Sequence, residues 1–380
     1  MQKNLTNNIN LPITIIILAL SILAAAMIFF PREAYASALL GLDLWWEVVT
    51  PALLPFFFIS EILLELNISR YLTRAMTPLM GPLFSLPGAA SLPVALGFCS
   101  GFPSGAAITA SLRRRGEITR EEGTRLICFT NNAGPLYISV AVASGLLNCS
   151  KAAAILAASH YGSNILIGVL LGLRAKSRGY RPSAATAGEV YSPLLPDPGR
   201  IVKAAASRAA ANITSIGCLM IFFSVLNGFF TSMPINGSPL FSGAIQGFWE
   251  MSLGVHALAE SELALTDIIP AVAAILGFGG VSVQTQVLTM IGDTDIRFTP
   301  FLLCRLFQAF LAYLGAKAIC SFVSLPAASF GSVAVIEPSR ILIRSTTTAL
   351  AAAAVLFGIS LAGLILLPLL RKRFPPDRRS

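Results

Sequence analysis

The sequence contains few charged residues and few residues that commonly ligate metals. Charged side chains make up 12% of its 380 residues, about half the share in a typical soluble domain. The two histidines, His160 and His256, are far apart, and the six cysteines include no C-x-x-C pair. We therefore expect no metal site, no disulfide framework and no cofactor, and we interpret the cysteines as small buried apolar residues.

Enzyme motifs are also missing. The sequence has no H-E-x-x-H or G-x-S-x-G motif, and the glycine-rich stretch at Gly101–Gly105 is not followed by the Gly-Lys-Ser/Thr of a phosphate-binding loop. No apolar segment carries a pair of acids at its centre. We therefore predict that the protein is not an enzyme and has no ATPase domain, so that any transport depends on a gradient or on a partner.

Apolar residues are abundant instead. They make up 55% of the chain, the mean hydropathy is +0.75, and several runs reach the roughly 20 residues that a helix needs to cross a bilayer. The net charge of +9 lies mostly in short loops between these runs, which is typical of cytoplasmic loops and not of nucleic-acid binding. The sequence predicts an all-α polytopic protein whose partner is the lipid bilayer.

Polar and apolar segments divide the chain into five parts. The N-terminal run Leu11–Phe30 is longer than the core of a usual signal peptide, so we favour a first transmembrane helix. A cleaved signal peptide is the alternative, because Ala36-Ser37-Ala38 resembles a cleavage site. The parts are an N-terminal helix (residues 1–35), a first repeat (36–174), a cytoplasmic linker (175–200), a second repeat (201–370) and a basic tail (371–380).

The segment Thr77–Leu112 carries three glycines, a proline and two serines near its centre, within Gly97–Ala107. Arginines flank it on both sides, which places both ends in the cytoplasm, and its 36 residues are short for two full spans. Broken helices at membrane depth are tolerated where they are buried in protein or line a watery cavity. We predict a re-entrant helical hairpin; two short helices in glycine contact are the alternative.

Two further segments have helix-breaking sequences. A helix that begins at Thr119 meets Asn131-Asn132-Ala133-Gly134-Pro135, where proline removes a backbone hydrogen bond. In the second half, Leu276–Gln286 contains three glycines and several polar residues, and we interpret it as a second hairpin. We expect both breaks near the middle of the membrane, which is where transporters place their substrate sites.

The two halves share short identities in the same order. Leu96-Gly97-Phe98 matches Leu276-Gly277-Phe278, and Leu126, Cys128, Ala133 and Tyr137 have the spacing of Leu302, Cys304, Ala309 and Tyr313. We predict two repeats, each with an interfacial helix, a re-entrant hairpin and a broken transmembrane helix. Acidic flanks at 260–267 and 293–295 favour an inverted repeat, whereas the basic end at 371–373 fits a parallel one.

The chemistry of broken helices suggests a solute site. Freed N–H groups suit carboxylates, and freed carbonyls suit Na⁺; a coupling Na⁺ or H⁺ is therefore left open. A charge such as Arg305 in an apolar run is a functional candidate by default, with a snorkelling or salt-bridged arginine as the alternative. The candidate substrate-binding residues are Gly101, Ser104, Gly105, Asn131, Asn132, Gly280, Ser282, Gln284, Gln286 and Arg305, and the candidate hinge residues are Pro103, Gly134, Pro135 and Gly279.

Three motifs of the first half resemble a known family. They are Gly97-Phe98-x-Ser100-Gly101-x-Pro103-x-Gly105-Ala106, Arg115-Gly116-Glu117-Ile118-Thr119-x-x-Glu122 and Asn131–Ile138. They resemble the YlbJ (SpoVV) family of sporulation integral membrane proteins, which carry the Gate, or nucleoside-recognition, domain. The resemblance implies movement of dipicolinic acid across the outer forespore membrane, and a fold similar to the core of concentrative nucleoside transporters.

These observations lead to three hypotheses. The first is a secondary transporter of a small anionic solute, above all dipicolinic acid, with alternating access around two hairpin tips. The second is a membrane scaffold or assembly factor for sporulation that transports nothing. The third is a nucleoside-type transporter, although the sequence shows no obvious match to the acidic nucleoside-binding residues of that core. A homo-oligomer is left open.

Overall fold

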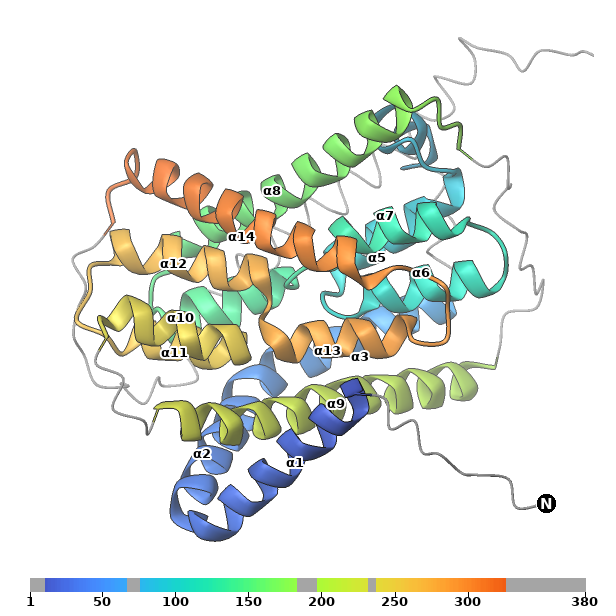
Figure 1. Ribbon diagram of the computed structural model, residues 1–380. Coiled ribbons are helices and arrows are strands. Elements are labelled where there is room, and N and C mark those ends of the chain that lie inside the picture. The colour runs from blue at the N-terminus through green and yellow to red at the C-terminus, as the bar shows by residue number, and fades with distance from the viewer. Residues whose placement is uncertain (1–10, 67–75, 183–196, 232–236, 326–380) are drawn as a thin grey trace, which may run out of the picture. The chain divides into compact units, whose positions relative to one another are not determined.

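The computed structural model describes residues 11–66, 76–182, 197–231 and 237–325. Within these ranges the regular elements are all helices (Figure 1). The predicted span at 341–370 and the basic tail lie outside the described residues. Four stretches are long and apolar enough to cross a membrane: α8 (Ser150–Ser177), α9 (Pro198–Thr231), α12 with α13 (Leu265–Phe278 and Gly280–Ile291) and α14 (Phe298–Cys320).

Two further helix pairs reach this length only together and are sharply bent. One bend of 108° joins α1 (Leu11–Phe29) to α2 (Pro31–Asp43) and η1 (Leu44–Val49). The other, of 105°, precedes α5 (Ser91–Cys99) and separates it from residues 76–84, which end in η2. The described chain therefore has four to six apolar spans, which confirms the prediction of an all-α polytopic membrane protein.

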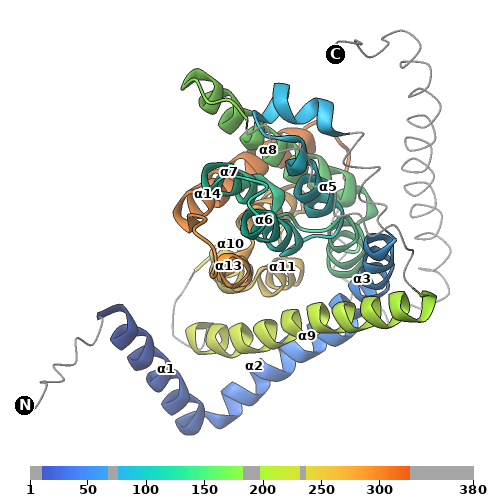
Figure 2. The same ribbon diagram turned by 90° about the vertical axis from the view of Figure 1, so that its right-hand side faces the viewer.

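Helix α9 holds the N-terminal elements in place. It lies along α2 and along α3 (Thr50–Glu65), as Figure 2 shows. The Trp45 indole donates a hydrogen bond of 2.9 Å to the Ile213 carbonyl, and the Arg208 guanidinium pairs with Glu61 at 2.8 Å. Because α3 also lines the cavity described below, α9 positions one wall of that cavity.

The first predicted hairpin is formed by α5 and α6 (Ser104–Arg114), which meet at a turn around Gly101. Gly101 has a φ of +79°, which side chains other than glycine rarely adopt. Gly97 on one arm and Gly105 on the other both face the Thr130 carbonyl, and a Cβ at either position would overlap it. The glycines therefore let both arms close onto the end of the next helix.

The next element is a broken helix, as the sequence predicts. Helix α7 (Arg120–Thr130) starts with a capping box, in which Glu122 accepts a hydrogen bond from the Thr119 N–H at 2.7 Å while its own N–H donates to the Thr119 hydroxyl. The chain is irregular over 131–134 and continues as the wide π-helical η4 (Tyr137–Leu146). The unbroken α8 follows.

The second hairpin is not where the sequence places it. Residues 276–286 belong to one 27-residue span, in which Gly279 and Gly280, with φ of +84° and +73°, interrupt the helix without reversing it. The antiparallel pair is instead α10 (Pro239–Trp249) and α11 (Met251–Ala259). Gly254 of α11 lies directly on Gly247 of α10, so glycines allow these two helices to touch.

The turn of this second hairpin is a single extended residue, Glu250, with φ of −144° and ψ of 123°. Its carboxylate accepts a hydrogen bond from the Leu253 N–H at 3.0 Å and so caps α11. Helix α14 is continuous, whereas the identities with α7 predict a break there. In the structure each half thus contains a hairpin, a broken helix and an unbroken helix, in that order; a repeat in the sequence remains a prediction.

Ion pairs locate the outer end of the first hairpin, which is the end away from its turn. Arg113 and Arg114, at the outer end of the first hairpin, pair at 2.8 Å with Asp295 and Asp293 after α13. The Arg113 guanidinium holds the pKa of the Asp295 carboxyl below its usual range. The acidic flank at 293–295 therefore lies beside the basic end of the first hairpin. This corrects the use of that flank as evidence for an inverted repeat, which would place it on the side of the membrane away from those arginines.

The outer end of the second hairpin is at the opposite end of the same span. Helix α11 ends at Ala259, and only five residues separate it from Leu265, where the α12–α13 span begins. The first hairpin opens toward the other end of that span, next to Asp293. The two hairpins therefore enter from opposite ends and direct their turns toward each other. This arrangement fits the inverted repeat that we favour.

Candidate functional site

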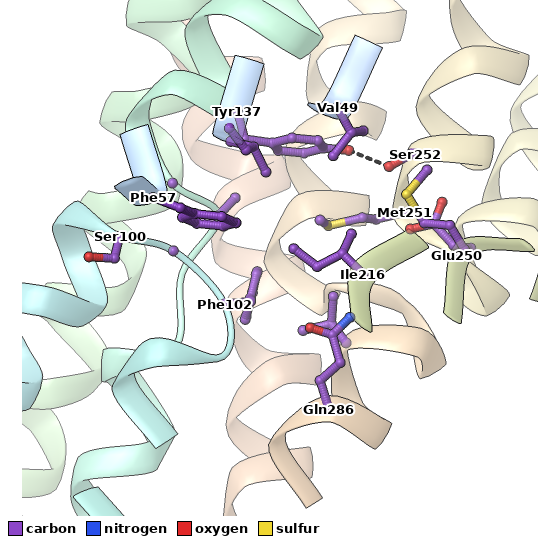
Figure 3. A pocket seen from close by; sticks show the side chains of 16 residues that line it. Val49, Phe57, Ser100, Phe102, Tyr137, Ile216, Glu250, Met251, Ser252 and Gln286 are labelled. Atoms are coloured by element: carbon purple, nitrogen blue, oxygen red, sulfur yellow. Dashed lines mark hydrogen bonds between the residues drawn. The ribbon is translucent and has the colours of Figure 1, made fainter. Parts of the chain in front are cut away.

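A cavity with an empty volume of about 500 Å³ lies where the hairpin turns meet the helix breaks (Figure 3). Residues of both hairpins, both broken helices, α3 and α9 line it. They are Val49, Leu53, Phe57, Ser100, Gly101, Phe102, Ala133, Gly134, Tyr137, Ile216, Met220, Glu250, Met251, Ser252, Val283 and Gln286. Elements from both halves of the chain thus build one site.

Each hairpin turn packs on the break of the helix that follows it. A Cβ on Gly101 would lie 2.9 Å from the Gly134 nitrogen, and one on Gly280 would lie 3.1 Å from both the Gly247 carbonyl and the Met251 nitrogen. Phe102 of the first half also lies close to the second half, because a Cβ added to Gly279 would be 3.5 Å from its ring. Backbone approaches as close as those of Gly101 and Gly280 need glycine.

Aromatic rings and a few polar groups form the wall. Phe57, Phe102 and Tyr137 supply the rings, and the Tyr137 hydroxyl hydrogen-bonds to the Ser252 hydroxyl at 2.6 Å, which joins the first break to the second hairpin (Figure 3). Among the described residues, none hydrogen-bonds to the Gln286 amide. An amide in this situation can donate to or accept from a solute.

Glu250 is the one carboxyl among the described lining residues, and no lysine, arginine or histidine accompanies it there. Its side chain is buried, with only 2% of the residue exposed. Positive potential in the cavity comes instead from helix ends. The first turn of α13 has no side-chain cap, and the helix that continues as η4 starts at Pro135, beside the cavity. The N–H groups and dipoles of these two helix starts favour a negative group nearby.

Arg305 lies outside the cavity and supports the first break. It is fully buried and donates to the Asn131 carbonyl at 2.8 Å, to the Cys128 carbonyl at 2.6 Å and to the Asn164 side-chain oxygen at 2.7 Å. The first two acceptors are carbonyls at the end of α7 that the break leaves without helical partners. The arginine therefore ties α14 and α8 to the C-terminal end of α7.

The two asparagines of the break continue this network. The Asn131 side chain accepts from the Ala106 N–H at 2.9 Å, which caps α6, and donates to the Ile127 carbonyl at 2.9 Å. The Asn132 side-chain oxygen accepts from Asn164. Next to them, the Ala133 N–H donates to the His160 ring at 3.1 Å. Both asparagines are fully buried, and their side chains bind protein groups.

The predicted site residues thus fall into three groups. Gly101, Gly134 and Gln286 line the cavity. Asn131, Asn132 and Arg305 form the support of the first break. The remainder lie beside the turns and breaks without lining the cavity: the Gln284 amide donates to the Phe278 carbonyl at 3.3 Å and closes α12, and the others are Pro103, Ser104, Gly105, Pro135, Gly279, Gly280 and Ser282.

Several residues that line the cavity are not among the site residues predicted from the sequence. Glu250 and Ser252 lie in an apolar stretch with the pattern of an amphipathic helix, and Phe57, Phe102 and Tyr137 resemble ordinary membrane-facing aromatics. One signal was available, because Glu250 is an acid within an apolar segment between Trp249 and Met251, and such a residue is a functional candidate by default.

Comparisons with known proteins identify relatives of this chain. A family model described as Gate, nucleoside recognition, matches residues 46–175, from η1 through the first hairpin and the first broken helix to α8. The sporulation integral membrane protein YlbJ of Bacillus subtilis (strain 168) is 34% identical over 319 residues, which cover 76% of this chain and 78% of that protein. No solved structure matches. The chain therefore belongs to the family of the sporulation integral membrane protein YlbJ.

Proposed function

We propose that this protein is a secondary transporter of a small, planar, polar solute, with dipicolinic acid as the first candidate and the outer forespore membrane as the site of action. One observation carries the proposal. Two hairpins that enter from opposite ends of a span meet two helix breaks at a single cavity. Discontinuous helices that converge on a site near mid-membrane are a plan of secondary transporters.

The cavity wall suits such a solute. Three aromatic rings offer flat apolar contact, the helix starts at Pro135 and at α13 favour a carboxylate, and the Gln286 amide supplies a directional hydrogen bond. Dipicolinic acid, an aromatic ring with two carboxyl groups, combines these requirements.

When access to the cavity changes from one side of the membrane to the other, contacts between the two halves of the chain would have to change. The Tyr137–Ser252 hydrogen bond joins the first break to the second half, and the Phe102 ring of the first hairpin lies close to Gly279. Movement of either hairpin changes these contacts and opens the cavity toward the end from which that hairpin enters. The glycine-rich turns permit such movement at small steric cost.

A nucleoside is the second candidate solute. The matching family model is described as nucleoside recognition, and the Glu250 carboxylate in the cavity is a group that accepts hydrogen bonds from sugar hydroxyls. The remaining hypothesis, a scaffold without a solute path, is tested by the same experiment because it predicts no uptake of either compound.

The test is uptake by liposomes that contain the purified full-length protein. Radiolabelled dipicolinic acid and uridine are supplied separately, and empty liposomes give the background. We expect saturable uptake of dipicolinic acid, reduced at least tenfold in Gln286→Leu. Thr289→Val, which removes an exposed hydroxyl of the same helix α13 outside the cavity lining, is the control and should transport like the wild type. Uptake equal to that of empty liposomes for both compounds would contradict the proposal.

A further inference from the structure

Glu250 combines features that a structural cap alone does not need. It forms the turn of the second hairpin, it is 2% exposed, and it lines the cavity. Figure 3 shows it beside Met251 and Ser252, across the cavity from Phe57. A serine or asparagine would cap α11 equally well, without the cost of a carboxyl group in an apolar surrounding.

The groups that face Glu250 from each neighbouring element are neutral or apolar. Tyr137 of η4 contributes a phenol, and Gln286 of α13 an amide. The lining residues of α3, of α9 and of the first hairpin turn are apolar side chains, Gly101 and Ser100, and the described lining residues include no cation. The Glu250 carboxylate accepts a hydrogen bond from a neutral backbone N–H, that of Leu253 at 3.0 Å. An ionised Glu250 therefore has no counter-ion among the described residues that line the cavity.

Because of these contacts, we propose that Glu250 takes up and releases a proton that is co-transported with a carboxylate solute; this rests on the transport function proposed above. When the cavity is open to solvent, the ionised group caps α11 and is hydrated. When a carboxylate solute enters and water leaves, two negative charges would face each other in an apolar cavity. One proton from the loading side then joins the Glu250 carboxylate.

Protonated Glu250 can bind the solute in a way that ionised Glu250 cannot. Its O–H donates a hydrogen bond to the solute carboxylate, while its second oxygen continues to accept from the Leu253 N–H. After the cavity opens to the other side, the solute leaves as the carboxylate and the proton leaves Glu250 to water. Each cycle therefore moves one proton with each solute molecule, and the carrier returns with Glu250 ionised.

The test compares uptake with and without an inward proton gradient, in liposomes that contain the full-length protein and with radiolabelled dipicolinic acid as the probe. In the wild type the gradient should raise initial uptake several-fold. In Glu250→Gln, which keeps an oxygen to cap α11, the ratio of the two rates should fall to about one. Glu250→Asp should retain a gradient effect, and Glu260→Gln, an exposed acid at the end of α11, should match the wild type.

The possible outcomes separate the two proposals. Wild-type uptake with the same gradient response in Glu250→Gln would overturn this inference and leave the transport function standing. No uptake by the wild type would overturn the transport function and the coupling with it. Infrared spectra of the same liposomes give a second readout: the carboxylic acid C=O band that rises on acidification should lose one component in Glu250→Gln relative to the wild type, and Glu260→Gln should retain that component. An unchanged band would overturn the inference.

Discussion

Replacement of Arg305 by methionine should destabilise the protein strongly, because the arginine supports the first helix break. Its guanidinium serves three buried acceptors, which are the Cys128 carbonyl, the Asn131 carbonyl and the Asn164 side chain. A buried acceptor that loses its partner costs about 1–3 kcal/mol. Burying the arginine's charge also had a desolvation cost, which the methionine variant does not have. We therefore take the lower part of this range for each acceptor and expect the free energy of unfolding to fall by about 3–4 kcal/mol in total.

The variant Arg305→Lys should lose less of the free energy of unfolding than Arg305→Met. An ammonium group can reach one or two of the acceptors but lacks the planar fork that serves all three, so we expect about half of the methionine effect. The assay is equilibrium unfolding of the purified protein in mild detergent titrated with a denaturing detergent, followed by circular dichroism. Arg297→Met, an exposed arginine just before α14, is the control and should change the free energy of unfolding by less than about 0.5 kcal/mol.

The reasoning would be refuted by one particular combination of results. If Arg305→Met unfolds like the wild type but no longer binds dipicolinic acid, the arginine acts as a solute ligand, as the sequence alone suggests, and its contacts with α7 are incidental. If both variants lose stability in the expected order, and binding weakens only in proportion to the folded fraction, the arginine is a support of the break.

Two further predictions concern the hairpin packing and the contact between the halves. Gly97→Ala should prevent stable folding, since its Cβ would overlap the Thr130 carbonyl, whereas Gly162→Ala, in open space on α8, should be neutral or stabilising by up to about 1 kcal/mol in the same unfolding assay. Tyr137→Phe and Ser252→Ala each remove the 2.6 Å hydrogen bond between the halves. Each should alter the uptake rate, and the double variant should match the single ones, because both remove one interaction; additive effects would argue against the contact.

The sequence predicts the first half of the site well because its breaks are marked by local chemistry. Gly101 needs a positive φ, Thr119 and Glu122 form a capping box at three-residue spacing, and Pro135 removes a hydrogen-bond donor. Each of these signals acts within one helical turn, so no tertiary contact is needed to recognise it.

The second half depends on contacts between segments. The turn at Glu250 has neither proline nor glycine, and the pairing of α10 with α11 depends on Gly247 and Gly254, which lie within one apolar run. Gly279-Gly280 indicate a break, but whether the chain reverses there depends on what packs against it. The direction of the Arg305 side chain depends in the same way on how α14 is rotated against α7, which the sequence does not specify.

Access to the cavity from both sides is the central claim, and labelling of one engineered cysteine tests it most directly. Val283→Cys, a cavity-lining position with no proposed solute contact, is made in a chain whose six native cysteines are replaced by serine, and a membrane-impermeant thiol reagent is applied to either side of sealed vesicles. We predict that the cysteine reacts from both sides and that dipicolinic acid slows both reactions. Reaction from one side or from neither, or reaction at a rate that dipicolinic acid leaves unchanged, would contradict alternating access at this site.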